Sequence, residues 1–127
     1  MIQMYSKDML IGIFLSHAGY YLIIEKREHT YKLGYTSRLR IRIGGKKEFL
    51  QAINRTLLQH EIDSVFVGIH LEINSFDSIC KVMELLPDVP DSKDKLKQFR
   101  ELVRMFKNKE HLTLEGLEKL MEIKGVI

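Results

Sequence analysis

The most informative chemical pattern in the chain is a row of three arginines, Arg38, Arg40 and Arg42, at every second position. The residues between them, Leu39 and Ile41, are apolar. Because side chains along a strand alternate between two faces, this spacing predicts one buried face and one face on which the guanidinium groups stand about 6–7 Å apart. The planar fork of a guanidinium group can hold a phosphate or the edge of a guanine. The row therefore predicts a surface that binds a nucleic acid.

Positive charge is concentrated around this row. Residues 26–47 contain eight basic residues and one acid, whereas the net charge of all 127 residues is only +3, so the rest of the chain is acidic on balance. Exposed strand arginines can merely prevent edge pairing, but a local concentration of charge is typical of a surface that binds a polyanion. A second basic segment, residues 93–109, is more typical of the solvated face of a helix. We expect the nucleic acid to be bound by Lys26, Arg27, Lys32, Thr36, Arg38, Arg40, Arg42, Lys46 and Lys47.

The sequence offers no other site with recognisable chemistry. The five histidines lack metal-ligand spacing, and the chain contains no CxxC pair, glycine-rich phosphate loop or GxSxG turn. We therefore expect no metal and no cofactor. The single cysteine, Cys80, excludes an internal disulfide, and the longest apolar stretch, residues 9–15, is far shorter than the ~20 residues that span a bilayer. These features predict a soluble, cytoplasmic protein without a membrane segment.

The elements that must position the basic residues follow from apolar periodicity and from typical capping residues. We expect first a helix over residues 7–18, capped by Ser6 and stopped by Gly19, and then strands over 20–26 and 30–43 that are joined by a turn at 27–29. A helix to about residue 60, strands over 64–67 and 70–74, and a helix that is capped by Ser75 and ends near Pro87 follow. The chain continues with a helix capped by Ser92 and a last helix that is capped by Thr113 and closed by Gly125. This α-β-β-α-β-β-α order with additional C-terminal helices predicts an α+β fold, and the length predicts a single domain over residues 1–127.

The first expected helix is apolar nearly all round and carries two small residues, Gly12 and Ser16, four positions apart. Small residues on one face let two helix backbones approach closely. The helix is therefore either buried in the chain's own core, or packs against a second copy with Gly12 and Ser16 at the interface. The sequence leaves both alternatives open.

Two stretches resemble the LAGLIDADG homing endonucleases. Residues 10–24, LIGIFLSHAGYYLII, are similar to the family's signature helix, which leads into a glycine and the first strand of a hairpin. Residues 96–127 are similar to its C-terminal stretch, in which a helix, an HLT-EGL segment and a final helix follow one another. The resemblance implies that two signature helices pack at a central interface and that an antiparallel sheet forms a saddle in the DNA major groove. The row of arginines then lies on that saddle.

The resemblance also implies a magnesium-binding acid at the end of the signature helix, and the chain departs from the family there. The position is Ala18 if Gly19 matches the last glycine of the motif, or His17 if Leu10 and Gly12 match its Leu-Gly pair. Neither residue supplies the carboxylate oxygen that Mg²⁺ prefers. We therefore expect no catalytic residue and a loss of nuclease activity.

These features predict a non-catalytic nucleic-acid-binding protein of LAGLIDADG-like fold. Structured RNA, such as ribosomal or intron RNA, is favoured over duplex DNA, and a second copy of the chain or ribosomal proteins are the expected protein partners. The alternative is an active homodimeric homing endonuclease that uses Mg²⁺, or a DNA-binding protein. A protein-interaction module with an incidental basic face is a third possibility.

Overall fold

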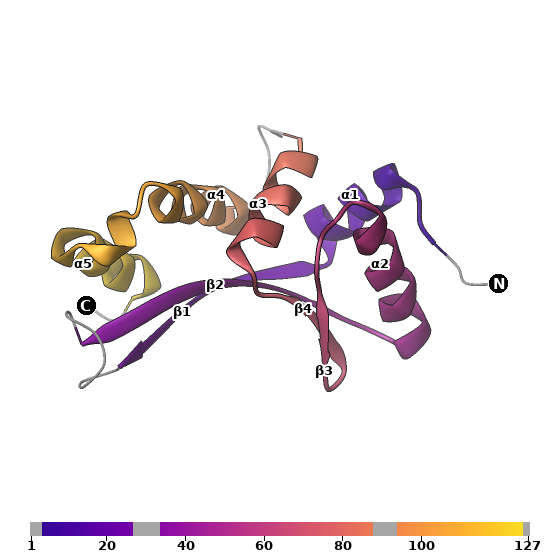
Figure 1. The fold of residues 1–127 in the computed structure, drawn as a ribbon, viewed down its shortest axis with the longest axis horizontal. Helices are drawn as coiled ribbons and strands as arrows, with labels where there is room; N and C mark the ends of the chain where they lie inside the picture. The colour runs from indigo at the N-terminus through magenta and orange to yellow at the C-terminus, as the bar shows by residue number, and fades with distance from the viewer. Residues whose placement is uncertain (1–3, 27–33, 88–93, 126–127) are drawn as a thin grey trace. The chain divides into compact units, whose positions relative to one another are not determined.

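The computed structural model describes residues 4–26, 34–87 and 94–125 (Figure 1). In order, these residues form α1 (Lys7–Ser16), β1 (Ala18–Lys26), β2 (Tyr35–Gly44), α2 (Lys47–Gln59), β3 (Val65–Val67), β4 (His70–Ile73), α3 (Phe76–Leu85), α4 (Asp94–Lys107), the 3₁₀ turn η1 (Glu110–Leu112) and α5 (Leu114–Lys124). The strands form one sheet in the order β1-β2-β4-β3. The α+β fold with additional C-terminal helices is thereby confirmed. The expected turn at 27–29 and the cap at Ser92 lie outside the described residues.

The chain divides into two compact units. The first combines Met1–Tyr21 with Arg40–Ser92, and the second combines Leu22–Leu39 with Lys93–Ile127. Strands β1 and β2 each contribute residues to both units. The single domain over residues 1–127 stays a prediction. Within the described residues, no helix combines the length and the apolar character that crossing a membrane requires.

Helix α1, in the first unit, ends earlier than the sequence predicts. Its last helical residue is Ser16, whereas the expected helix ran to Ala18 and used Gly19 as its stop. The N–H of His17 makes a final helical hydrogen bond to the carbonyl of Ile13 at 2.8 Å, and Ala18 already begins β1. Gly19 therefore lies inside a strand, and the change to the extended conformation rather than a glycine cap ends the helix.

The register of β2, β4 and β3 gives the sheet of the first unit two different faces. Residues directly opposite one another in antiparallel strands point to the same face. Two neighbouring rows lie on opposite faces, one made of Arg42, Glu72 and Val65 and the other of Ile43, Leu71 and Phe66. Ile43 and Leu71 of the second row belong to the core, since each is only 1% exposed, whereas Phe66 is 50% exposed. Helices α1, α2 and α3 contribute further buried residues to this core, among them Phe14, Ile53, Leu57, Ile79 and Val82.

In the second unit, the apolar stripe that the sequence predicts on α4 is buried, and its members are Leu96, Phe99, Leu102, Val103 and Phe106. Thr113 caps α5, as expected, by accepting a hydrogen bond from the N–H of Gly116 at 3.0 Å, and Gly125 closes the helix with a φ of +83°. Gly116 has a steric role, because a Cβ there would collide with the backbone carbonyl of Glu110. The Thr113 cap and this contact fix the turn between η1 and α5.

His111 in η1 is held in a stacked contact that makes the second unit sensitive to pH. Its ring lies parallel to that of Phe106, with 4.0 Å between the ring centroids. Its Nδ1 is buried and has no hydrogen-bond partner among the described residues. Burial lowers the pKa of His111 below its ordinary value of 6.5, because the imidazolium ion loses solvation. The unfolded chain therefore binds this proton more readily than the folded chain does.

We expect the protein to lose stability as the pH falls below about 6.5, and the variant His111→Phe to lose less. The contribution of His111 is complete above its unfolded-state pKa of 6.5 and is lost as the pH falls through the lower, folded-state pKa. Phenylalanine keeps the stacking on Phe106 and cannot be protonated. The measurement is the difference in Tm between about pH 7.5 and about pH 5 for both proteins. Equal differences would contradict the assignment.

Candidate nucleic-acid interface

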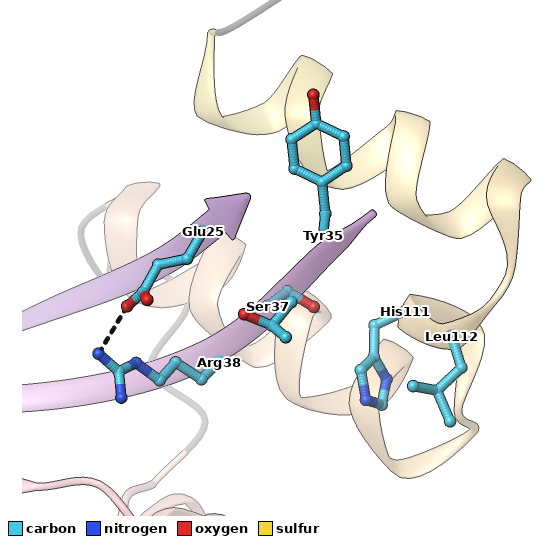
Figure 2. Close-up of a pocket in the computed structure, with 7 residues that line it drawn as sticks. Glu25, Tyr35, Ser37, Arg38, His111 and Leu112 are labelled. Carbon is cyan, nitrogen blue, oxygen red and sulfur yellow. Dashed lines mark hydrogen bonds and ion pairs between the residues drawn. The ribbon is translucent and has the colours of Figure 1, made fainter. Parts of the chain in front are cut away.

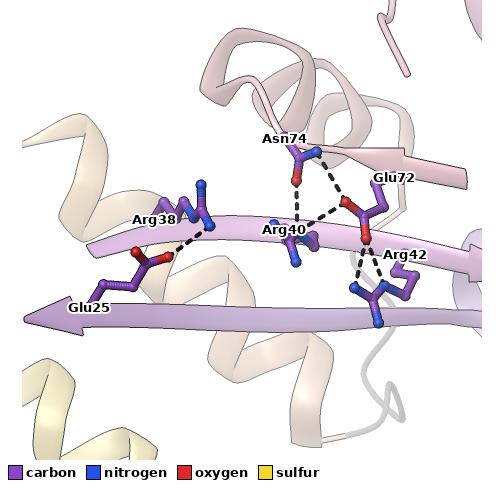
Figure 3. A network of polar contacts seen from close by, with 6 residues as sticks. All are labelled: Glu25, Arg38, Arg40, Arg42, Glu72 and Asn74. Carbon is purple, nitrogen blue, oxygen red and sulfur yellow. Dashed lines mark hydrogen bonds and ion pairs between the residues drawn. The ribbon is translucent and has the colours of Figure 1, made fainter. Parts of the chain in front are cut away.

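The arginines of β2 alternate with buried residues, as the sequence predicts. The side chains of Arg38, Arg40 and Arg42 are 58%, 20% and 34% exposed. The residues between and after them are at most 3% exposed, namely Leu39, Ile41 and Ile43. We call the side of β2, β4 and β3 to which Arg40 and Arg42 point the arginine face; both residues belong to the first unit, whereas Arg38 belongs to the second. Figure 3 shows its charged residues.

A buried carboxylate lies between two of the arginines. Glu72 of β4 is 3% exposed, and its Oε2 accepts hydrogen bonds from two nitrogens of Arg42, at 2.9 and 2.7 Å (Figure 3). Its Oε1 lies 3.4 Å from Nε of Arg40, which also donates to Oδ1 of Asn74 at 2.8 Å. In the structure Arg40 and Arg42 share one acid, so the cluster keeps one excess positive charge.

Glu72 stays ionised in spite of its burial. Burial alone would raise the pKa of its carboxyl group. Hydrogen bonds from Arg42 and Asn74, together with the positive charges of Arg40 and Arg42, outweigh that effect and lower the pKa below its ordinary value. The guanidinium group of Arg42 also lies 5.8 Å from the ring centroid of Tyr21. Charge and hydrogen bonding thus hold both guanidinium groups in fixed orientations.

Arg38, in the second unit, makes a different kind of contact. One of its terminal nitrogens lies 2.8 Å from Oε1 of Glu25, and both side chains are partly exposed, at 58% and 32%. An exposed ion pair of this kind stabilises a protein by about 1 kcal/mol at most, so a phosphate can replace Glu25 at little loss. The pair borders a cavity of about 380 Å³ whose lining also includes Tyr35, Thr36, Ser37, His111 and Leu112 (Figure 2). Thr36, another expected binding residue, therefore lies beside Arg38.

The expected lysines lie at the ends of the strands. Lys26 is the exposed last residue of β1. Lys46 and Lys47 are exposed at the start of α2, two and three residues after the end of β2. Arg27 and Lys32 lie outside the described residues. The structure thus places three of the five lysine and arginine residues that flank the row on exposed surface.

The two positions that could have held the catalytic acid have other roles. Nε2 of His17 lies 2.9 Å from the carbonyl oxygen of Gly44, which makes this nitrogen the donor, and the ring meets that of Phe49 edge-on, with centroids 5.6 Å apart. Ala18 is the first residue of β1. The described part of the chain contains no group of three histidine, cysteine or acidic side chains arranged to hold a metal ion. His17 therefore ties the end of α1 to the end of β2.

Helix α1 is buried on one side and exposed on the other. Leu10, Ile13 and Phe14 are buried in the core of the first unit. Gly12 and Ser16 are exposed, and a Cβ added at Gly12 would meet no atom within 4 Å. The packing within the chain therefore does not require glycine at this position. The use of Gly12 and Ser16 in an interface stays a prediction.

Neither the models of protein families nor the curated protein sequences give a match to this chain. Several solved structures, by contrast, are similar to it. The homing endonuclease I-TnaI superposes with a TM-score of 0.77 and 26% identity, over 95% of this chain and 86% of that one. The LAGLIDADG meganuclease I-CpaMI, solved bound to uncleaved DNA, gives a TM-score of 0.77 and 20% identity over 97% of this chain. The LAGLIDADG homing endonuclease I-LtrWI, solved bound to target DNA, gives 0.75 and 23% over 97%.

The share of each solved chain that this chain covers differs between the three proteins. This chain spans most of I-TnaI, but only 45% of the I-CpaMI chain and 44% of the I-LtrWI chain. The shared architecture extends over nearly all of this chain in each case, from α1 through the sheet to the C-terminal helices. The chain therefore has a LAGLIDADG-like fold.

Proposed function

We propose that the chain binds a nucleic acid through the arginine face, with duplex DNA as the first candidate partner. The observation that carries the proposal is the ordered pair Arg40 and Arg42 on the solvent side of an antiparallel sheet. Two proteins of the same fold, I-CpaMI and I-LtrWI, were solved bound to DNA, which supports a duplex as the partner. Arginines in a row on a sheet suit a groove lined by phosphates and base edges.

The Glu72 cluster adds to this support because it orders the arginines before any ligand arrives. Arg42 uses two of its N–H donors on Glu72, and a guanidinium group has five, so the others can reach a phosphate or a guanine. A side chain that is already held in place loses less conformational entropy on binding. The excess charge of the cluster remains positive. The arginine face is thus both ordered and cationic.

Structured RNA, such as ribosomal or intron RNA, is the second candidate, with ribosomal proteins as possible partners. It is favoured by the identity of the residues at the expected metal position, since His17 and Ala18 supply no carboxylate for cutting a duplex. RNA of this kind is recognised through its shape, its 2′-hydroxyl groups and its unpaired bases. A cationic sheet face is compatible with such a ligand.

A titration at several salt concentrations tests the proposal. The probes are a randomised duplex DNA pool and a transcribed, hairpin-rich RNA pool of equal length, each measured between about 50 and 200 mM salt. We expect the duplex to bind more tightly, with log affinity falling linearly with log salt as phosphate contacts release counterions. Tighter binding of the RNA pool would favour the second candidate. An absence of salt-dependent binding to both pools would overturn the proposal and leave a protein-interaction module.

We further expect the protein to bind without cutting. Hydrolysis in a two-metal site needs carboxylates that clamp Mg²⁺ between the attacking and the leaving oxygens, and His17 and Ala18 cannot supply them. A plasmid that carries the duplex selected from the pool should remain supercoiled in Mg²⁺ or Mn²⁺, while an active homing endonuclease cuts its own target in the same buffer. Linear product that disappears on adding a chelator would show instead an active enzyme.

A further inference from the structure

Two valines of β3 lie on the arginine face. Val65 lies opposite Glu72 in the register, and Glu72 lies opposite Arg42, so the three side chains point to the same side of the sheet. Val67 lies opposite His70 and points to that side as well. The two valines are 51% and 48% exposed. The arginine face therefore carries charge on β2 and an apolar edge on β3.

The apolar groove next to β3 does not account for the exposure of these valines. Strand β3 is at the edge of the described sheet, where natural proteins usually place charged residues or proline to prevent unwanted pairing. Phe66, between the valines, points to the opposite face and lines an apolar groove of about 300 Å³ with Leu50 and Ile69. Val65 and Val67 do not line that groove. Two half-exposed branched residues remain on the side of the sheet that carries the arginines.

We propose that Val65 and Val67 contact thymine methyl groups in the major groove of the duplex bound by the arginine face. This inference rests on the proposed function. The C5 methyl group of thymine is the apolar group that a base pair offers in the major groove, and apolar side chains read it by contact. Uracil lacks this methyl group. The valines would therefore give the protein a preference for DNA and for A·T pairs at defined positions.

The spacing of the two valines defines the pattern of bases. Alternate residues of a strand are about 6.6 Å apart, and bases along one DNA strand are about 3.4 Å apart, so the two side chains match bases two steps apart. Arg42 lies in the same row as Val65, two strands away, and can contact a phosphate or a guanine while Val65 covers a methyl group. The expected target thus contains two thymines separated by one base.

The test compares thymine with uracil in one DNA target. A duplex is selected from the randomised pool with the wild type and then synthesised with thymine or with deoxyuridine, which differ only in the methyl group. We expect the wild type to bind the deoxyuridine version about fifteenfold more weakly, because each of the two covered methyl groups contributes roughly fourfold. The double variant Val65→Ser/Val67→Ser removes the side-chain methyl groups and should bind both versions almost equally, with the salt dependence of the wild type.

The matched control is Phe66→Ser, which removes an apolar group from the other face of the same strand. It should keep the preference of the wild type for thymine, and Tm values verify that each variant is folded. Equal binding of both duplexes by the wild type would overturn the inference while leaving duplex binding intact. A preference that persists in the double variant would assign the methyl contact to other residues. Failure to bind either pool would overturn the proposed function itself, and tighter binding of the RNA pool would overturn the thymine contact.

Discussion

Removing the arginines together with Glu72 is expected to weaken duplex binding by roughly a hundredfold or more at about 0.1 M salt. The variant is Arg38→Ala/Arg40→Ala/Arg42→Ala/Glu72→Gln. Each phosphate contact contributes a slope of about −0.9 to the dependence of log affinity on log salt, so three lost contacts should flatten the slope by two to three units. The measurement is the affinity for the randomised duplex at several salt concentrations.

Glu72 belongs in this variant for a structural reason. Alanine at Arg40 and Arg42 alone would leave a buried carboxylate without its cations, which destabilises a protein by about 3–5 kcal/mol. A loss of binding by the triple alanine variant could then reflect unfolding. Glutamine at position 72 keeps the shape of the side chain and removes its charge. Equal Tm values for the quadruple variant and the wild type are the condition for interpreting the titration.

The matched control is Glu72→Gln alone, which should have the opposite effect. Arg40 and Arg42 lose the carboxylate that competes with phosphate, so non-specific affinity should rise, by roughly tenfold, and the salt slope should become steeper. A quadruple variant that binds with the affinity and slope of the wild type would contradict the assignment of the arginine face. The basic helix α4 would then be the better candidate surface.

The parts of this structure that follow from neighbouring residues could be predicted from the sequence. Ser6, Ser75 and Thr113 cap their helices, because a cap depends only on the residue and the turn that follows it. The buried and exposed faces of β2 follow from strict alternation between apolar and basic residues. Local rules therefore fixed most elements and located the arginine face. These rules were less accurate at the boundary between α1 and β1, where the helix ends at Ser16 and the strand begins at Ala18.

The charge balance of the interface could not be predicted in the same way. Glu72 meets Arg42 across 30 positions of sequence, and that meeting depends on the register of β2 with β4. Position 72 did carry one signal, an acid between the apolar residues Leu71 and Ile73 in an expected strand. The side on which Val65 lies depends on the order of three strands, which no local pattern determines. Long-range pairing thus decides which charges remain on the arginine face.

The second large effect is expected at α1, where Gly12→Leu should convert a dimer to a monomer. Met9, Gly12 and Ser16 form an exposed stripe on this helix, and Met9 is 52% exposed. This chain spans less than half of the chains of I-CpaMI and I-LtrWI, and the resemblance to the LAGLIDADG homing endonucleases implies that two such helices pack together. Close approach of two α1 helices requires a small residue at the seam, and a leucine side chain would separate them.

Gly12→Leu distinguishes an interface from a general loss of stability because the two effects have opposite signs. A Cβ at this position meets no atom within 4 Å, and leucine favours a helix over glycine by roughly 0.8 kcal/mol, so the monomer should unfold at an equal or higher temperature. Light scattering at high micromolar concentration should show a dimer for the wild type and for the control Gly12→Ala, and a monomer for Gly12→Leu. A wild type that stays monomeric under these conditions would contradict the interface. Its exposed stripe would then have to be covered by another protein or by the nucleic acid.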